Sequence, residues 1–175
     1  TGVGINALLS RYLGEKKQEK ASRVAMHGLF CALCNWIVFA LIGIFFSKSF
    51  LQLFSDDAQI IAMGIEYMQI CTIFSFGVFI QITYERIMQS TGNTVYNMII
   101  QGIGAIVNII LDPIFIFGMF QMPAMGVKGA AVATVAGQMV AMLLGIIITQ
   151  KKVQEIQMRF QGFQIDVAML KSMYR

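Results

Sequence analysis

The chain has 175 residues, of which 57% are hydrophobic and 13% charged, and its formal net charge is +4. Soluble domains carry about 45–50% apolar and about 25% charged residues, so this composition excludes an ordinary soluble protein and predicts a membrane protein. A membrane-crossing helix needs roughly 20 apolar residues, so the length allows a handful of spans.

Apolar segments long enough to cross a membrane follow one another along the chain. Thr1–Tyr12 is expected to be the inner end of a helix, and a short charged connection follows it. The predicted spans are 23–46, 60–89, 95–118 and 126–149, joined by a loop at 47–59, a tight turn at 90–94 and a connection at 119–125. The sequence therefore predicts an all-α, polytopic helical membrane bundle.

Residues 1–150 are expected to form this bundle, and 151–175 a polar, basic segment with an amphipathic helix near 165–174. The chain opens within an apolar stretch and ends without a closing element. We therefore expect it to be a portion of a longer protein.

Most cations gather at one set of span ends: Arg11, Lys16, Lys17, Lys20, Arg23, Arg86, Lys151, Lys152, Arg159, Lys171 and Arg175. Only Lys48 and Lys128 fall at the other set. Because cytoplasmic loops carry an excess of Lys and Arg, 13–23, 90–94 and 151–175 are predicted to be cytoplasmic. We expect a multi-pass protein of the inner (plasma) membrane that contacts lipid, and the positive charge then needs no nucleic-acid partner.

One acidic residue, Asp112, lies inside the third predicted span. A carboxylate at bilayer depth costs about 2.5–3.5 kcal/mol and therefore usually has a function. Asn108 shares its helix face at a spacing of four, and Pro113 cannot donate a hydrogen bond to the carbonyl of Ile109. A carboxylate, an amide and a free carbonyl suit a proton or a hard cation. The pattern predicts an ion-coupled transporter, with a structural hydrogen bond between helices as the alternative.

Other polar side chains fall at a similar depth on neighbouring spans. At 1.5 Å per residue, Asp112 lies about 9 Å below the outer end of its span, Tyr67 about 10 Å and Thr134 about 12 Å. Asn108, Asn35 and Trp36 lie about 15 Å below their outer ends. We therefore expect one internal site in the outer half of the membrane.

The residues expected to bind a proton or Na⁺ at this site are Asp112, Asn108, Tyr67 and Thr134. Those expected to line a substrate cavity or form a hinge are Pro113, Gln101, Asn35, Trp36 and Gln138. Packing or interfacial anchoring is the alternative for the aromatic residues and Asn35, and a bond to its own helix carbonyl is the alternative for Thr134.

Three further features are assigned structural roles. Small residues recur every four positions along the fourth span, at Gly129, Ala133, Gly137, Ala141 and Gly145, which predicts close helix packing. His27, Glu85 and Arg86 lie near inner span ends, where we expect solvated, capping or headgroup-level groups. Cys31-x-x-Cys34 has no second ligand pair and is expected to be a pair of helix thiols. No metal is expected beyond Na⁺ at Asp112 and Asn108, and no cofactor beyond the coupling ion.

Three stretches, 2–21, 108–118 and 126–138, resemble the multidrug and toxic compound extrusion (MATE) family. The resemblance implies part of a twelve-helix transporter that exchanges H⁺ or Na⁺ for cationic or amphipathic compounds, and not an enzyme. The chain resembles the N-terminal lobe from the end of its second helix through its sixth, followed by the inter-lobe linker and the start of the seventh.

The resemblance also implies a cation site built from Asp112, Asn108, Tyr67 and Thr134, together with an acid on a first helix and a C-terminal lobe that lie outside this chain. A flippase for lipid-linked oligosaccharides is the first alternative, but its anionic cargo would favour a basic cavity. An intramembrane enzyme would need paired catalytic groups, which one acid does not supply. A passive channel would show no coupling to an ion gradient.

Overall fold

The computed structural model describes residues 2–153, 156, 166 and 169–171. The helices are α1 (Gly2–Gly14), α2 (Gln18–Leu51), α3 (Ala58–Ile73), α4 (Phe76–Ser90), α5 (Thr94–Phe117) and α6 (Val127–Lys152). This confirms the predicted all-α bundle. The amphipathic helix expected near 165–174 lies largely outside the described residues.

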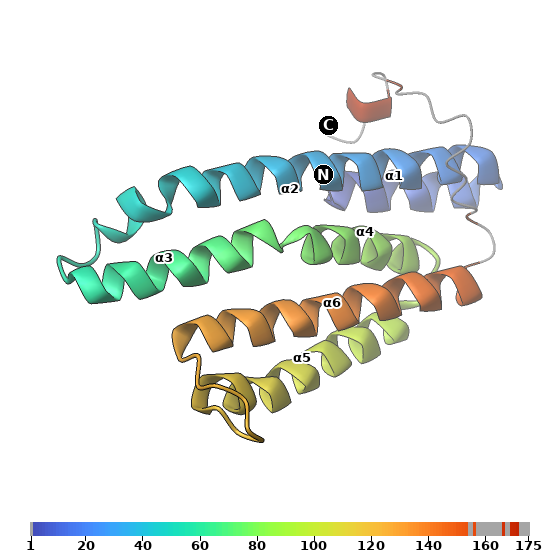
Figure 1. Ribbon diagram of the computed structural model, residues 1–175. Helices are drawn as coiled ribbons and strands as arrows, with labels where there is room; N and C mark the ends of the chain where they lie inside the picture. Colours follow the sequence, from blue (N-terminus) through green and yellow to red (C-terminus); the bar gives the residue numbers. More distant parts are fainter. Residues whose placement is uncertain (1, 154–155, 157–165, 167–168, 172–175) are drawn as a thin grey trace.

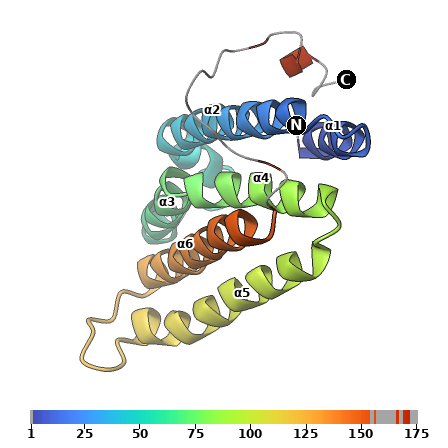
Figure 2. The ribbon, with the colours of Figure 1, turned by 90° about the vertical axis from the view of Figure 1, so that its right-hand side faces the viewer.

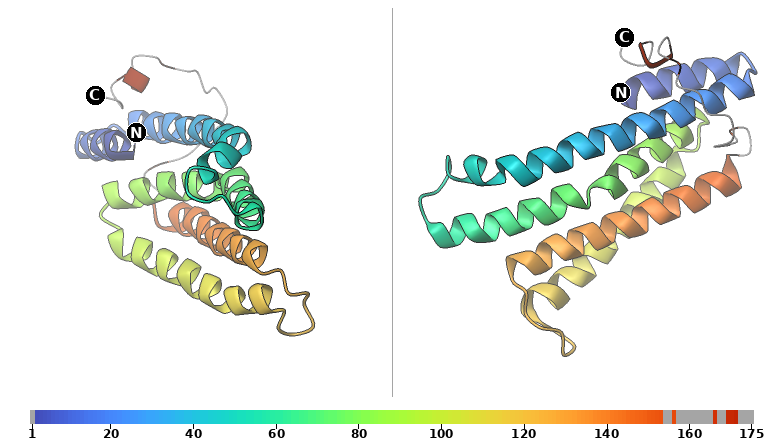
Figure 3. Two further views of the ribbon diagram at one scale, coloured as in Figure 1. Left: turned by 90° about the vertical axis from the view of Figure 1, so that its left-hand side faces the viewer. Right: turned by 45° about the horizontal axis from the view of Figure 1, so that its top comes forward.

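The long helices run side by side in a layered bundle (Figure 1). α1 packs on α2 and α4, and α2 packs on α3. α6 lies between α4 and α5, as Figure 2 shows, and α5 makes its main contact with α6. Figure 3 shows that the axes of α2, α3 and α6 lie nearly parallel, with the chain running through α2 in the opposite direction to α3 and α6. One face of α5 is therefore left without a neighbouring helix.

α2, α5 and α6 are each long and apolar enough to cross a membrane, and α3 with α4 passes the same test as a bent pair. This agrees with the predicted number of spans. α2 begins before and ends after the predicted span 23–46, which shortens the following loop. Asp57 ends that loop, because its Oδ1 accepts a hydrogen bond from Gln59 N at 2.8 Å and caps α3.

The second predicted span, 60–89, consists of two helices and not of one straight helix. The segment is divided at Phe74 and Ser75, where α3 and α4 meet with a bend of 42°. Ser75 Oγ donates to the carbonyl of Thr72 at 2.7 Å, and Trp36 Nε1 donates to the carbonyl of Ile73 at 2.8 Å. Side-chain donors thus replace helical hydrogen bonds at the break, which satisfies the backbone inside an apolar environment.

The buried core gathers at the end of the bundle that the positive charges predict to be cytoplasmic. Side chains from α1, α2, α4 and α5 meet there, among them Leu9, Val24, Ile87, Met88 and Ile100, which are all fully buried. Large apolar side chains elsewhere point outward, such as Phe45 with 72% and Ile109 with 67% exposure. An apolar exterior of this kind is what a lipid-facing bundle requires.

The small residues of α6 bring α5 and α6 together, as predicted. Every member of the stripe is buried: Gly129, Ala133, Gly137, Ala141 and Gly145. A Cβ added to Gly137 would lie 2.7 Å from the carbonyl oxygen of Gly104 and 3.2 Å from Asn108 Cβ. The two backbones therefore approach closely beside Asn108.

Candidate cation-binding site

Asn108 links α5 to α6 within the predicted site. Its Nδ2 donates to Asp112 Oδ1 and to Thr134 Oγ1, each at 3.4 Å. Asp112, Asn108 and Thr134 are all half-buried. The hydroxyl of Thr134 thus accepts a bond from the neighbouring helix, which favours the site assignment over a purely local bond.

Tyr67 completes the group from α3. Its phenol interacts with the side chains of Thr134 and Cys71, and it lies within electrostatic range of Asp112. Three helices therefore bring together a carboxylate, an amide, a hydroxyl and a phenol, which are the four residues expected to bind the cation. Their binding role remains a prediction.

Close packing at Gly137 positions Asn108 and Thr134 relative to each other. Because Gly137 has no side chain, α6 can lie against Asn108. Thr134 lies one turn before Gly137 on α6, and its side chain therefore also reaches Asn108. Pro113 lies inside α5, which continues to Phe117. Proline has no N–H, so the carbonyl of Ile109, one turn before Pro113, lacks its usual helical donor.

The residues predicted to line a cavity or hinge occupy different places. Trp36 bonds to the backbone at the break between α3 and α4. Its ring also packs edge-on against the ring of Phe76, with 5.7 Å between the two centroids. Asn35 and Gln138 are half-buried, and within the described chain neither bonds to the Asp112 group. Gln101 lies deeper along α5, where its Nε2 donates to Glu85 Oε1 at 2.6 Å.

Glu85 and His27 were expected at the membrane surface or in solvent, and both expectations are wrong. Glu85 is only 7% exposed, and its Oε1 also accepts a bond from Gln81 Nε2 at 3.3 Å. His27 is 1% exposed; its Nδ1 lies 2.7 Å from the carbonyl of Arg23, and its Nε2 accepts from Asp166 N at 2.9 Å. The spacing of Gln81 and Glu85, four apart on one helix, was the available signal for a polar cluster.

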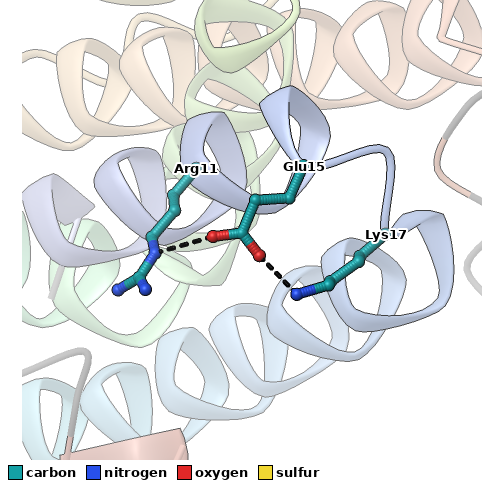
Figure 4. Close-up of polar contacts among 3 residues, drawn as sticks. All are labelled: Arg11, Glu15 and Lys17. Atoms are coloured by element: carbon teal, nitrogen blue, oxygen red, sulfur yellow. Dashed lines mark hydrogen bonds and ion pairs between the residues drawn. The ribbon is translucent and has the colours of Figure 1, made fainter.

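The connection between α1 and α2 is charged and exposed, as predicted. Arg11 Nε lies 3.1 Å from one carboxylate oxygen of Glu15, and Lys17 Nζ lies 2.7 Å from the other (Figure 4). The hydrogen bond from Lys17, followed by that from Arg11, lowers the pKa of Glu15 below its usual value. These are the ion pairs within the described part of the chain.

Cys31, Cys34 and Cys71 are free thiols. Across residues 2–153 and the few later positions that the structure describes, His, Cys, Asp and Glu form no group of three that could hold a metal. The Asp112 group instead offers one carboxylate with neutral oxygen ligands. Such a set suits a proton or Na⁺ better than a transition metal.

The sequence and fold match known transporters. The MatE family model matches residues 1–114. A probable multidrug resistance protein, YoeA of Bacillus subtilis, is 26% identical over 156 residues, which cover 89% of this chain and 34% of that protein. The multidrug export protein MepA of Staphylococcus haemolyticus is 25% identical, with 99% of this chain and 38% of that protein covered.

Solved structures of MATE transporters have a similar fold. An inward-facing MATE family transporter of the MOP superfamily superposes with a TM-score of 0.88 at 24% identity, over 98% of this chain and 38% of that one. The chain thus spans about a third of the length of the curated relatives it matches. Because the family model matches more than half of the chain, the chain belongs to the multidrug and toxic compound extrusion (MATE) family.

Proposed function

We propose that the protein carrying this chain is a secondary active antiporter that exports cationic or amphipathic compounds in exchange for H⁺ or Na⁺. The observation that carries the proposal is the convergence of Asp112, Asn108, Thr134 and Tyr67 from α3, α5 and α6. Intramembrane acids held by neutral polar groups are typical of ion pathways. Membership of a multidrug transporter family supports the cargo class.

In this proposal Asp112 binds the coupling ion, and Asn108, Thr134 and Tyr67 complete its surroundings. Occupancy neutralises the carboxylate beside Pro113, where the missing backbone hydrogen bond permits α5 to bend. Bending opens or closes the cavity of the lobe and thereby couples ion entry to expulsion of the substrate. The rest of the transporter, including a C-terminal lobe, supplies the other wall of the pathway.

The proposed orientation follows the positive charges. Segments 13–23, 90–94 and 151–175 face the cytoplasm in the plasma (inner) membrane. The ion then enters from the outer side, where the Asp112 group lies nearest. Gln138 and Asn35 remain proposed cavity-lining residues, since both are half-buried and on helices that contact the site helices.

The experiment that tests this function is efflux from proteoliposomes containing the complete transporter. A fluorescent organic cation is loaded, and a pH step or a Na⁺ step is applied separately across the membrane. Antiport predicts accelerated efflux with one of the two gradients. Efflux at the same rate under both gradients and without any gradient would favour a passive channel and refute the proposal.

A further inference from the structure

Glu85 is more deeply buried than Asp112 and has no cationic partner among the described residues. The whole Glu85 residue is 7% exposed, while Asp112 is half-buried. The ion pairs of the described residues lie elsewhere, at Glu15. An ionised carboxylate removed from water is costly unless a charge compensates it. Glu85 therefore calls for a proton or a bound cation.

Neutral amides surround this carboxylate from two helices. Gln81 on α4 and Gln101 on α5 both donate to Glu85 Oε1, at 3.3 and 2.6 Å. Asn97, one turn before Gln101 on α5, donates its Nδ2 to the backbone carbonyl of Glu85 at 3.1 Å. The group thus fixes the carboxylate in place without neutralising it.

Asn97 supplies a second, independent sign of a ligand. Its side chain is 5% exposed, and its Oδ1 is buried without a hydrogen-bond partner in the part of the chain that the structure describes. The same amide donates its Nδ2 to the backbone carbonyl of Glu85, so this oxygen belongs to a side chain that contacts Glu85. A buried acceptor without a donor costs about 1–3 kcal/mol, and a cation or protonated water would satisfy it.

Several charged groups on α4 and on the helices packed against it have other partners, although Arg86 Nε is buried without a hydrogen-bond partner among the described residues. Arg86 Nη1 donates to Gln89 at 2.7 Å, and Lys152 of α6 lies over the ring of Tyr96 at 5.6 Å. Arg11 of α1 pairs with Glu15, and His27 of α2 bonds to Asp166. No basic side chain among the described residues therefore lies within ion-pair distance of Glu85.

Gln101 connects this group to the Asp112 site. Asn108 and Asp112 come seven and eleven residues after Gln101, so the three side chains lie on one face of α5. Eleven residues correspond to about 16 Å along a helix, toward the end of the bundle where the core lies. Gln101 is itself exposed, so the Glu85 group reaches the surface of the bundle.

We propose that Glu85, Gln101, Gln81 and Asn97 form a second binding site for a small monovalent cation, H⁺ or Na⁺, about 16 Å along α5 from Asp112. The carboxylate supplies the charge, and Asn97 Oδ1 supplies a neutral oxygen ligand, while Gln81 and Gln101 hold the carboxylate in place through their Nε2 groups. The contacts of Glu85 with Gln81, Gln101 and Asn97 define the site. Its role as an intermediate binding site for an ion moving between Asp112 and the cytoplasm rests on the proposed antiport function.

The test counts cations bound by the complete transporter in detergent, with ²²Na⁺ equilibrium binding and with proton uptake during a pH titration. The variants are Glu85→Gln, Asp112→Asn and both together. Glu85→Gln is nearly isosteric and keeps an acceptor for Gln81 or Gln101. It should remove one bound Na⁺ or one bound H⁺ per molecule, whether or not Asp112 is intact.

A Glu85→Gln protein that binds both cations with the wild-type count would overturn the proposal and leave Glu85 as a structural hydrogen-bond acceptor. Loss of one cation in Glu85→Gln with no loss in Asp112→Asn would contradict the proposed function while supporting this second site. The two hypotheses can therefore fail separately.

Gln101→Ala provides a variant that keeps the carboxylate, in case Glu85→Gln does not fold. Loss of the Gln101 amide should weaken Na⁺ binding roughly tenfold, because the carboxylate loses the donor that fixes its position. Unchanged binding of both cations would exclude Gln101 from the site and overturn the proposal.

Discussion

Trp36 on α2 donates its indole N–H to the backbone carbonyl of Ile73 at 2.8 Å, where the second span divides into α3 and α4. This bond satisfies a carbonyl that the broken helix leaves without its usual donor. A side chain 37 residues away in sequence thus stabilises the bend that orients α3 and, with it, Tyr67.

Trp36→Phe should therefore destabilise the bundle while keeping an aromatic ring beside Phe76. The loss of one hydrogen bond between membrane helices costs about 0.6–1.7 kcal/mol. The measurement is thermal unfolding of the purified transporter, with hydrogen exchange at Phe74 and Ser75 as a local readout. Phe45→Leu is the control, because Phe45 is 72% exposed on the same helix. Equal melting of both variants would show that the Trp36 bond contributes nothing.

Gly137→Ala should force α5 and α6 apart. The added Cβ would lie 2.7 Å from Gly104 O and 3.2 Å from Asn108 Cβ, where backbone atoms have little freedom to move. Overpacking of this kind costs about 1–3 kcal/mol and should also weaken the contact between Asn108 and Thr134.

Gly102→Ala on α5 is the matched control, since nothing lies within 4 Å of its added Cβ. Alanine stabilises a helix by up to about 1 kcal/mol relative to glycine, so this variant should melt at the wild-type temperature or above. If Gly137→Ala were as stable as Gly102→Ala, the close approach of the two helices would be contradicted.

Thr134→Val should weaken the response to the coupling ion, because valine keeps the shape but removes the hydroxyl that accepts from Asn108. We expect the ion concentration for half-maximal efflux to rise roughly tenfold, which corresponds to about 1.4 kcal/mol. Thr134→Ser restores the oxygen and should remain close to wild type. Equal half-maximal concentrations in the valine and serine variants would remove Thr134 from the cation site.

Glu15 should titrate below its usual pKa, because Lys17 and Arg11 hold the charged form. A lowered pKa in the folded state adds stability above the unfolded-state pKa, and this contribution disappears as the pH falls through the folded-state value. Carboxyl NMR should show the pKa of Glu15 rising toward normal in Lys17→Ala. Lys16→Asn is the control, since it removes an adjacent charge that makes no ion pair with Glu15 among the described residues. An equal rise in both variants would contradict the specific pairing.

Much of this architecture could be predicted from the order of apolar segments and the side on which the cations fall. The convergence on Asp112 followed from depth, because polar residues at equal depth on adjacent spans tend to meet. The break at Phe74 and Ser75 could not be predicted, since no proline marks it and its support comes from Trp36 on another helix.

The burial of Glu85 was missed for a related reason. Its position near a span end predicts a headgroup-level charge, but α4 is packed among other helices, and Asn97 and Gln101 of α5 bond to the buried Glu85. His27 is buried through contacts that include Asp166, which lies 139 residues away in sequence. Local pattern gives the depth of a residue in the membrane, whereas its exposure depends on how the helices pack.

The most direct test of the central claim is uphill export by the complete transporter carrying Asp112→Asn. Substrate accumulation against its gradient is measured in proteoliposomes under an imposed H⁺ or Na⁺ gradient, with exchange of labelled for unlabelled substrate as the check on folding. We predict that substrate exchange persists while gradient-driven accumulation is lost. Accumulation at the wild-type level in the Asp112→Asn transporter would contradict the assignment of Asp112 as the site where the coupling ion binds.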